Sequence, residues 1–297
     1  MKNFPLINCC IAFVTLLLLS SCKKNYITYY NKVNDIDSTY RLANNPKLAI
    51  KEYRDLFDEY EPKNQERIQE YATYITLADQ YNKDFGGKES LYKLILLIAP
   101  YNNEYKKYLP IFNKYGIDNK SVEQEIAQWK KNLNKQLIDS FTIAFTRDQA
   151  GRPEDTALIR KNIEKNAKLF MWAFKEYGFP SVQKIGLIGN NGNGFYIPTM
   201  LTHMNESKDH YPYIKEKLLE YVKSGDLSPH DYALMDDAYM GIHKKSTVYG
   251  FNFIQVKDSA QINRNRKSIG IPSMKHSFKI RKDYYKNLKQ NDTHNLQ

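Results

Sequence analysis

Apolar residues recur at helical spacing along the first half of the chain. Between Pro46 and Pro62 they fall every three or four residues, at positions 49, 53, 56, 57 and 60. A second stripe of this kind runs from Ile68 to Ala78 and stops before two glycines at 86 and 87. One-sided stripes predict amphipathic helices, and the short proline-marked link between them predicts a helical hairpin.

The next segments extend this helical pattern. Residues 91–98 are apolar on nearly every side and predict the most buried helix of the front half, and residues 105–112 predict another helix. Hairpins in series are typical of tetratricopeptide repeats. The Trp, Gly, Ala and Pro landmarks of those repeats are not in register here, so we favour a non-repeating helical bundle over residues 37–140 and keep the repeat as an alternative.

A long stripe from Val122 to Ala144 predicts one continuous helix, the longest of the chain. The same four-residue step then reaches Asp148 and Arg152, so an apolar face ends in an acid and a base. Pro153 disfavours helical geometry at Arg152 and places the helix end near Gly151. The two side chains form either an ordinary ion pair at the helix end or the first side of a polar site.

The second half is more irregular. Residues 158–174 predict an amphipathic helix, the Gly- and Asn-rich residues 189–194 an ordinary loop, and residues 195–204 a helix that ends at His203. Ser228 and Pro229 are typical of a helix start. Alternation at 248–253 predicts a short strand, and residues 260–268 a short basic helix. The fold class is therefore mainly α, with a mostly helical α+β second domain that contains a short strand or hairpin.

The N-terminus has the pattern of a bacterial export signal. Lys2 precedes an apolar run of 14 residues, 6–19, which is shorter than the roughly 20 residues that a membrane-spanning helix needs. The run ends in Leu19-Ser20-Ser21-Cys22, which resembles the lipobox of bacterial lipoproteins. This resemblance implies that residues 1–21 are a signal peptide and that Cys22 is acylated and becomes the mature N-terminus. Residues 22–36 are then expected to form a polar tether.

Charge and cysteine content fit an exported, anchored protein. Removing 21 of the 297 residues leaves 276, lowers the net charge from +11 to +10 through the loss of Lys2, and leaves Cys22 as the last cysteine, so no disulfide is expected. A net positive charge favours binding to nucleic acid or to anionic membranes. Export argues against nucleic acid, and Lys23 after the lipidated cysteine favours the outer membrane, with the protein facing the periplasm.

A series of motifs in the second half resembles a bacterial domain-of-unknown-function family. That family has, in order, Asp-Gln-x-x-Arg, Gly-Trp-Pro, His-Ala-Asp, Asp-Arg, Tyr-Gly-Thr-Gln, and an Arg before Gly-Leu. The matching residues here are Asp148-Gln149-x-x-Arg152, Gly178-Phe179-Pro180, His203, Asp236, Tyr249-Gly250, and Arg266 before Gly270-Ile271. The resemblance implies a domain over residues 141–276. The polar, basic composition of residues 277–297 predicts a mobile tail.

This sequence departs from the family pattern at several chemically important positions. Asn205 stands where the family has the Asp of His-Ala-Asp, Asp237 replaces the Arg of Asp-Arg, and Phe251-Asn252 replaces Thr-Gln. These losses favour binding over catalysis.

We therefore expect a polar site that brings together residues far apart in the chain. Its candidate residues are Asp148, Gln149, Arg152, His203, Asp236, Tyr249, Asn252 and Arg266. The histidines and aspartates lack tight metal-ligand spacing, so no metal and no cofactor are expected.

Three functions remain open at this point. The first is a ligand- or protein-binding lipoprotein, for which the ligand is a small molecule of unknown identity. The second is a hydrolase-like envelope enzyme in which His203 and Asp236 are the acid/base pair and Arg152 or Arg266 holds an anionic group. The third is a structural adaptor that binds a protein partner through the helical front half.

Overall fold

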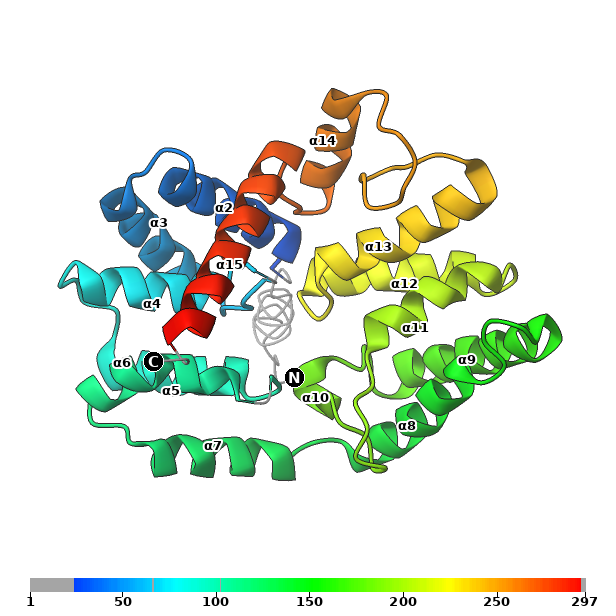
Figure 1. Ribbon diagram of the computed structural model, residues 1–297, viewed down its shortest axis with the longest axis horizontal. Coiled ribbons are helices and arrows are strands. Elements are labelled where there is room, and N and C mark those ends of the chain that lie inside the picture. The colour runs from blue at the N-terminus through cyan, green and yellow to red at the C-terminus, as the bar shows by residue number, and fades with distance from the viewer. Residues whose placement is uncertain (1–23, 66, 102, 295–297) are drawn as a thin grey trace, which may run out of the picture.

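The computed structural model describes residues 24–65, 67–101 and 103–294, with side chains described as far as residue 286. The predicted signal peptide and Cys22 lie outside these residues. The described part of the chain is built of helices, which confirms the mainly α class. Figure 1 shows that the helices follow one another around a circuit, and that the last helix returns to pack against the first described one.

The front half consists of short helices joined by tight turns. In chain order they are α2 (Tyr26–Arg41), α3 (Pro46–Glu59), α4 (Glu70–Gln80), α5 (Gly87–Ile98), the 3₁₀ turn η1 (Glu104–Tyr108), α6 (Leu109–Lys114) and α7 (Asn119–Lys131). Helices α3 and α4 pack together as the predicted hairpin. Their apolar stripes are buried, with Ala49, Tyr53, Ile75 and Ala78 fully inaccessible.

The second half contains longer helices and more loop. In chain order they are α8 (Lys135–Gln149), α9 (Thr156–Glu176), α10 (Val182–Ile185), α11 (Ile197–His203), the 3₁₀ turn η2 (Met204–Glu206), α12 (Tyr211–Ser224), α13 (Pro229–Tyr239), the π turn η3 (Met240–Lys244), α14 (Ser259–Ser268) and α15 (Met274–His294). Buried apolar side chains from α2 to α15 belong to one continuous cluster, so both halves share a core.

The predicted tether is instead largely a core helix. Residues Tyr26–Arg41 form α2, in which Tyr29 and Val33 are fully buried. Its polar residues are buried as well: Asn34 donates to the Gly270 carbonyl at 2.9 Å, and Asp37 contacts His276. These partners lie more than 230 residues away in the sequence. The local sequence therefore predicted a solvated tether, although the helix is buried.

The predicted long helix is two helices. The break falls at Asn132, Leu133 and Asn134, where α7 ends and α8 begins. Asn134 is the N-cap of α8: its side chain accepts the Leu137 N–H at 3.0 Å, and its own N–H donates to the Lys184 carbonyl at 2.8 Å. Asn favours such caps over helix interiors, which explains the break in an apolar stripe that itself continues.

The predicted short strand does not form. Residues 248–253 follow an irregular path of bends because the Asp237 carboxylate, rather than a neighbouring strand, accepts the N–H groups of Val248, Tyr249 and Phe251. In the described residues, β pairing is limited to one isolated antiparallel bridge between Ile188 and Gly194, at the Gly/Asn-rich loop.

The predicted mobile tail is largely helical. Residues Met274–His294 form α15, which lies against α2 (Figure 1). His276 and Ile280 are 4% exposed and anchor its first turns. Gly270, at φ +88°, precedes this helix, and an added Cβ there would lie 2.5 Å from the Tyr30 side chain. The close approach of Gly270 to Tyr30 positions α15 on α2.

Across the described residues, no helix is both long enough and apolar enough to cross a membrane.

Candidate functional site

The stretch from Arg147 to Arg152 forms the first part of the site, at the end of α8. Asp148 is 1% exposed, and its carboxylate contacts Nδ1 of His203 at 2.8 and 3.0 Å. Gln149 donates to the same carboxylate at 2.7 Å. Arg152 donates from Nε to the Asp148 backbone carbonyl at 2.8 Å, and its Nη2 lies 3.8 Å from the carboxylate. Asp148 therefore joins the C-terminal ends of α8 and α11.

The contact with Asp148 sets the chemistry of His203. Because Nδ1 faces a carboxylate, it is the nitrogen that carries a hydrogen, and Nε2 of the neutral ring is left as an acceptor. The His203 side chain is 23% exposed, so the ring reaches the surface. A histidine oriented by a carboxylate is the arrangement of a general base.

Helix α9 holds this stretch in place. Arg147 donates to Asn166 Oδ1 at 2.9 and 2.7 Å, and Asn166 donates to the Ala144 carbonyl at 3.2 Å. Asn162 donates to the Arg147 carbonyl at 2.9 Å. Both asparagines are buried on the inner face of α9. Sequence reasoning missed them, although two Asn residues four positions apart on an otherwise apolar face were the available signal.

Asp236 lies in a different environment, on α13. Its carboxylate accepts from the Tyr211 hydroxyl at 2.7 Å and from Lys215 Nζ at 2.6 Å, both on α12. Burial and the neighbouring Asp236 charge raise the pKa of the Tyr211 hydroxyl well above its usual value. The Tyr211 ring stacks on Tyr239 with centroids 4.1 Å apart.

These residues form an aromatic groove of about 430 Å³ between α12 and α13. Its lining residues are Tyr211, Pro212, Lys215, Glu216, Leu219, Tyr232 and Tyr239. Three tyrosine rings, the Lys215 ammonium group and the Glu216 carboxylate line the groove. This lining suits a small ligand that has both apolar and polar parts.

Asp237, the neighbour of Asp236, organises the loop that follows α13. Its carboxylate accepts the Thr247 hydroxyl at 2.9 Å and the N–H groups of Val248, Tyr249 and Phe251 at 2.6, 3.1 and 2.7 Å. Asn252 donates to the Asp237 and Ser246 carbonyls, both at 2.8 Å. The Asp at this position, a departure from the family pattern, is therefore a structural residue of the loop.

Arg266 is buried beneath the same loop, at 3% exposure. It donates to the Pro272 carbonyl at 2.8 Å, the Tyr249 carbonyl at 2.9 Å and the Ser277 hydroxyl at 2.9 Å. Burial lowers the pKa of its guanidinium to about 10, an effect that the charge of Asp237 partly opposes. Its guanidinium also lies 4.7 Å from the centre of the Phe251 ring.

The predicted site residues therefore gather in three clusters. Asp148, Gln149, Arg152 and His203 form one, Asp236 belongs to the groove, and Tyr249, Asn252 and Arg266 surround Asp237. The sequence suggested His203 and Asp236 as an acid/base pair, but in the structure His203 contacts Asp148 while Asp236 contacts Lys215 and Tyr211.

The other histidines have partners of their own. His210 lies 3.0 Å from both the Ser207 hydroxyl and the Glu164 carboxylate, and His243 contacts the Asn205 carbonyl at 3.1 Å. Within the part of the chain that the structure describes, no three His, Cys, Asp or Glu side chains gather as metal ligands would.

A further buried polar network joins the first and last helices. Asp37 on α2 contacts His276 Nε2 at 2.8 Å and accepts from Arg41 at 2.7 Å, and Arg41 lies 3.4 Å from Asp283 on α15. No local pattern predicts these contacts, because the partners lie at opposite ends of the chain.

Comparison with known proteins gave no match to any family model, curated protein or solved structure. The resemblance of the motifs at 148–271 to an uncharacterised bacterial family stays a prediction, and the function of the chain must be inferred from its own residues.

Proposed function

We propose that this protein is a membrane-anchored envelope lipoprotein that binds a small ligand in the aromatic groove between α12 and α13. The observation that supports the proposal is the groove itself, two of whose lining residues, Tyr211 and Lys215, are held in place by the buried Asp236 carboxylate. The lipobox-like sequence ending at Cys22 supports the anchor and the envelope location, with the outer membrane as the expected site.

The composition of the groove favours a ligand with an apolar face and neutral hydrogen-bonding groups, as a sugar ring has. Tyrosine rings offer flat apolar surfaces at low cost in side-chain entropy. Lys215 and Glu216 stand at the rim, where an ammonium group can donate to hydroxyls and a carboxylate can accept from them. The adjacent opposite charges give the groove little net charge, which argues against a strongly ionic ligand.

Binding can be tested by saturation-transfer NMR with glucose, galactose and N-acetylglucosamine. We expect at least one of these sugars to bind the wild-type chain and to lose about tenfold or more in affinity in a Lys215→Met variant, because one charge-assisted hydrogen bond contributes about 1.5 kcal/mol or more.

Lys217→Met is the matched control, since Lys217 lies on the same helix but pairs with Glu220 outside the groove. Equal losses in the two variants, or no binding of any of the three sugars, would contradict a sugar-binding groove.

A second function is favoured by one specific contact. The pairing of Asp148 with His203 supports a hydrolase-like activity in which His203 activates water, with Asp148 rather than Asp236 as its orienting partner. No hydroxyl or thiol side chain is hydrogen-bonded to His203 in the described part of the chain, so the attacking group in such a reaction is water.

This activity is testable with p-nitrophenyl acetate and p-nitrophenyl phosphate. A hydrolase of this kind requires turnover that falls by at least 10²-fold in His203→Gln. Asp236→Asn serves as the control and should retain turnover. Turnover that is absent in the wild type, or unchanged in His203→Gln, excludes this use of His203 for these esters.

The anchor is tested independently of either site. A Cys22→Ala variant should lose incorporation of radiolabelled palmitate and retention in the membrane fraction. A labelled Cys22→Ala protein would show that Cys22 is not the lipidation site.

A further inference from the structure

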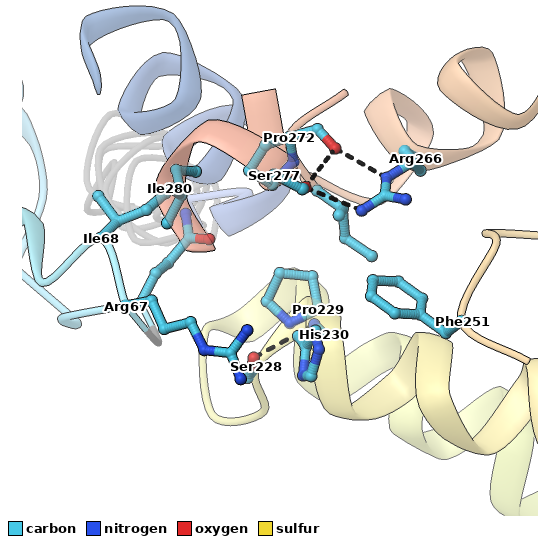
Figure 2. A pocket seen from close by; sticks show the side chains of 12 residues that line it. Arg67, Ile68, Ser228, Pro229, His230, Phe251, Arg266, Pro272, Ser277 and Ile280 are labelled. Carbon is cyan, nitrogen blue, oxygen red and sulfur yellow. Dashed lines mark hydrogen bonds between the residues drawn. The ribbon is translucent and has the colours of Figure 1, made fainter. Parts of the chain in front are cut away.

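A second cavity, which shares no lining residue with the aromatic groove, lies where the segment before α4 and the segment from α14 into α15 meet the N-terminus of α13 (Figure 2). Its volume is about 90 Å³. The segment before α4, the start of α13, the loop after α13, and the segment from α14 into α15 all contribute to its wall. Its polar and charged lining residues are Gln65, Arg67, Ser228, His230, Arg266 and Ser277.

The cavity is electropositive. Arg67, His230 and Arg266 all line it, and none of its described lining residues is acidic. Figure 2 shows Arg67 and Arg266 approaching from opposite sides, one from the segment before α4 and the other from α14. Two guanidinium groups and one imidazole ring therefore line one small space.

Among the described residues, no carboxylate forms a direct ion pair with Arg266. Its three hydrogen bonds go to two backbone carbonyls and a serine hydroxyl, all uncharged acceptors. Asp237 exerts an attraction on it, but the Asp237 carboxylate is occupied by four donors from residues 247–251. A buried guanidinium without a carboxylate partner attracts an anion strongly, because the low-dielectric surroundings screen its charge weakly.

Neutral donors and apolar walls complete the site. The hydroxyls of Ser228 and Ser277 and the amide of Gln65 line the cavity, and α13 begins there with its positive dipole end. Ile68, Ile271 and Ile280 form an apolar wall, and an apolar wall lowers the local dielectric and strengthens electrostatic attraction.

We propose that this cavity binds a phosphate group, either as inorganic phosphate or as a small phosphate monoester. The volume suits a group of a few heavy atoms, since one water molecule takes about 30 Å³ in the liquid. A phosphate group carries about −1.5 to −2 charges near pH 7, which matches two arginines better than the single charge of a carboxylate does. The site is separate from the aromatic groove and does not depend on the function proposed for it.

Isothermal titration calorimetry on the full chain at low ionic strength tests the proposal. The probes are inorganic phosphate, glycerol 3-phosphate and acetate. We expect saturable binding of at least one phosphate compound, weaker binding of acetate, and a loss of about tenfold or more for the phosphate compound in each of the variants Arg67→Gln and His230→Gln.

Arg264→Gln is the matched control, because Arg264 is an exposed arginine on α14 that pairs with Gln261 and does not line the cavity. Circular dichroism and the melting temperature establish that each variant is folded. Arg266→Lys is a further variant: it keeps the charge but loses the planar fork, and should also weaken phosphate binding.

The two phosphate sources are distinguished by the probes. Glycerol 3-phosphate that binds at least as tightly as phosphate identifies an ester, such as a lipid headgroup, whereas binding of inorganic phosphate alone identifies the free ion. The proposal is overturned if the folded wild type binds neither compound, or if Arg264→Gln weakens binding as much as Arg67→Gln and His230→Gln do.

Discussion

Asp237 and Asp148 are both buried carboxylates at the C-terminal ends of helices, but they bind different kinds of donors. Asp237 is surrounded by backbone N–H groups and one threonine hydroxyl, all from the loop that follows its own helix. Asp148 contacts the side chains of His203, Gln149 and Arg152, all of which reach solvent. The first region fixes the path of the backbone, and the second presents titratable groups at the surface.

This difference distinguishes a carboxylate that stabilises the fold from one that can act in a functional site. A carboxylate that is saturated by backbone donors has no capacity left for a substrate, and its removal leaves several buried donors without acceptors. A carboxylate that orients a histidine acts through that histidine and is the better candidate for function. By this criterion Asp237 stabilises the fold, and Asp148 is the better candidate for a functional site.

The largest effect is expected from Asp237→Ala. The four donors from residues 247–251 lose their shared acceptor, and we expect the free energy of unfolding to fall by about 3–5 kcal/mol. Urea unfolding followed by circular dichroism measures the change. Asp258→Ala is the control: Asp258 caps α14 and accepts a single N–H, from Gln261, so its loss should cost about 1 kcal/mol. Equal effects in the two variants would show that the loop does not depend on Asp237.

Glu70 is a third buried carboxylate, and it accepts hydrogen bonds from one side chain and from one backbone N–H group. It is fully buried and accepts from both the Tyr29 hydroxyl at 2.8 Å and the Gln65 N–H at 2.6 Å. Burial raises its pKa to about 7 from an ordinary value of 4.5. Between pH 4.5 and pH 7 the folded state therefore binds more protons than the unfolded state. The contribution of Glu70 to the stability of the fold is fully present below about pH 4.5 and is lost as the pH rises through 7.

Glu70→Gln should therefore flatten the dependence of stability on pH. In the wild type, Glu70 lowers the free energy of unfolding by up to about 3 kcal/mol between pH 4.5 and 7, and the glutamine variant should lack that slope. Urea unfolding at a series of pH values measures it. Glu89→Gln, at an exposed position on α5, is the control and should leave the slope unchanged. A slope that survives in Glu70→Gln would assign the effect to other groups.

The elements that were predicted most accurately are those whose sequence signals, such as periodicity and capping residues, lie within the element itself. The stripe of α3, the Ser228 cap of α13 and the basic helix α14 lie close to where periodicity and capping residues place them. The contact of Asp148 with its own helix end at Arg152 was also within reach, because four residues separate the two.

The errors came from contacts between distant residues. Residues 22–36 were expected to form a tether because this segment is polar, but α2 is buried, and Asn34 and Asp37 find their partners in Gly270 and His276, far away in the sequence. Alternation at 248–253 suggested a strand, but a strand needs a neighbour, and here the backbone donors bind the Asp237 carboxylate instead. Likewise, the sequence suggested Asp236 as the partner of His203, whereas the fold brings the C-terminal ends of α11 and α8 together and pairs His203 with Asp148.

The smallest effect, and the most direct test of that partner choice, comes from double-mutant cycles. We expect a coupling energy of about 1 kcal/mol between Asp148→Asn and His203→Gln, because they share a charge-assisted hydrogen bond at 2.8 Å. A second cycle pairs His203→Gln with Asp236→Asn and should give a coupling within about 0.5 kcal/mol of zero, because Asp236 is bound to Tyr211 and Lys215 instead. Urea unfolding of the single and double variants supplies both values. If His203 couples to Asp236 as strongly as to Asp148, then the two carboxylates act on one histidine, and the separation of the site at the end of α8 from the groove at α13 fails.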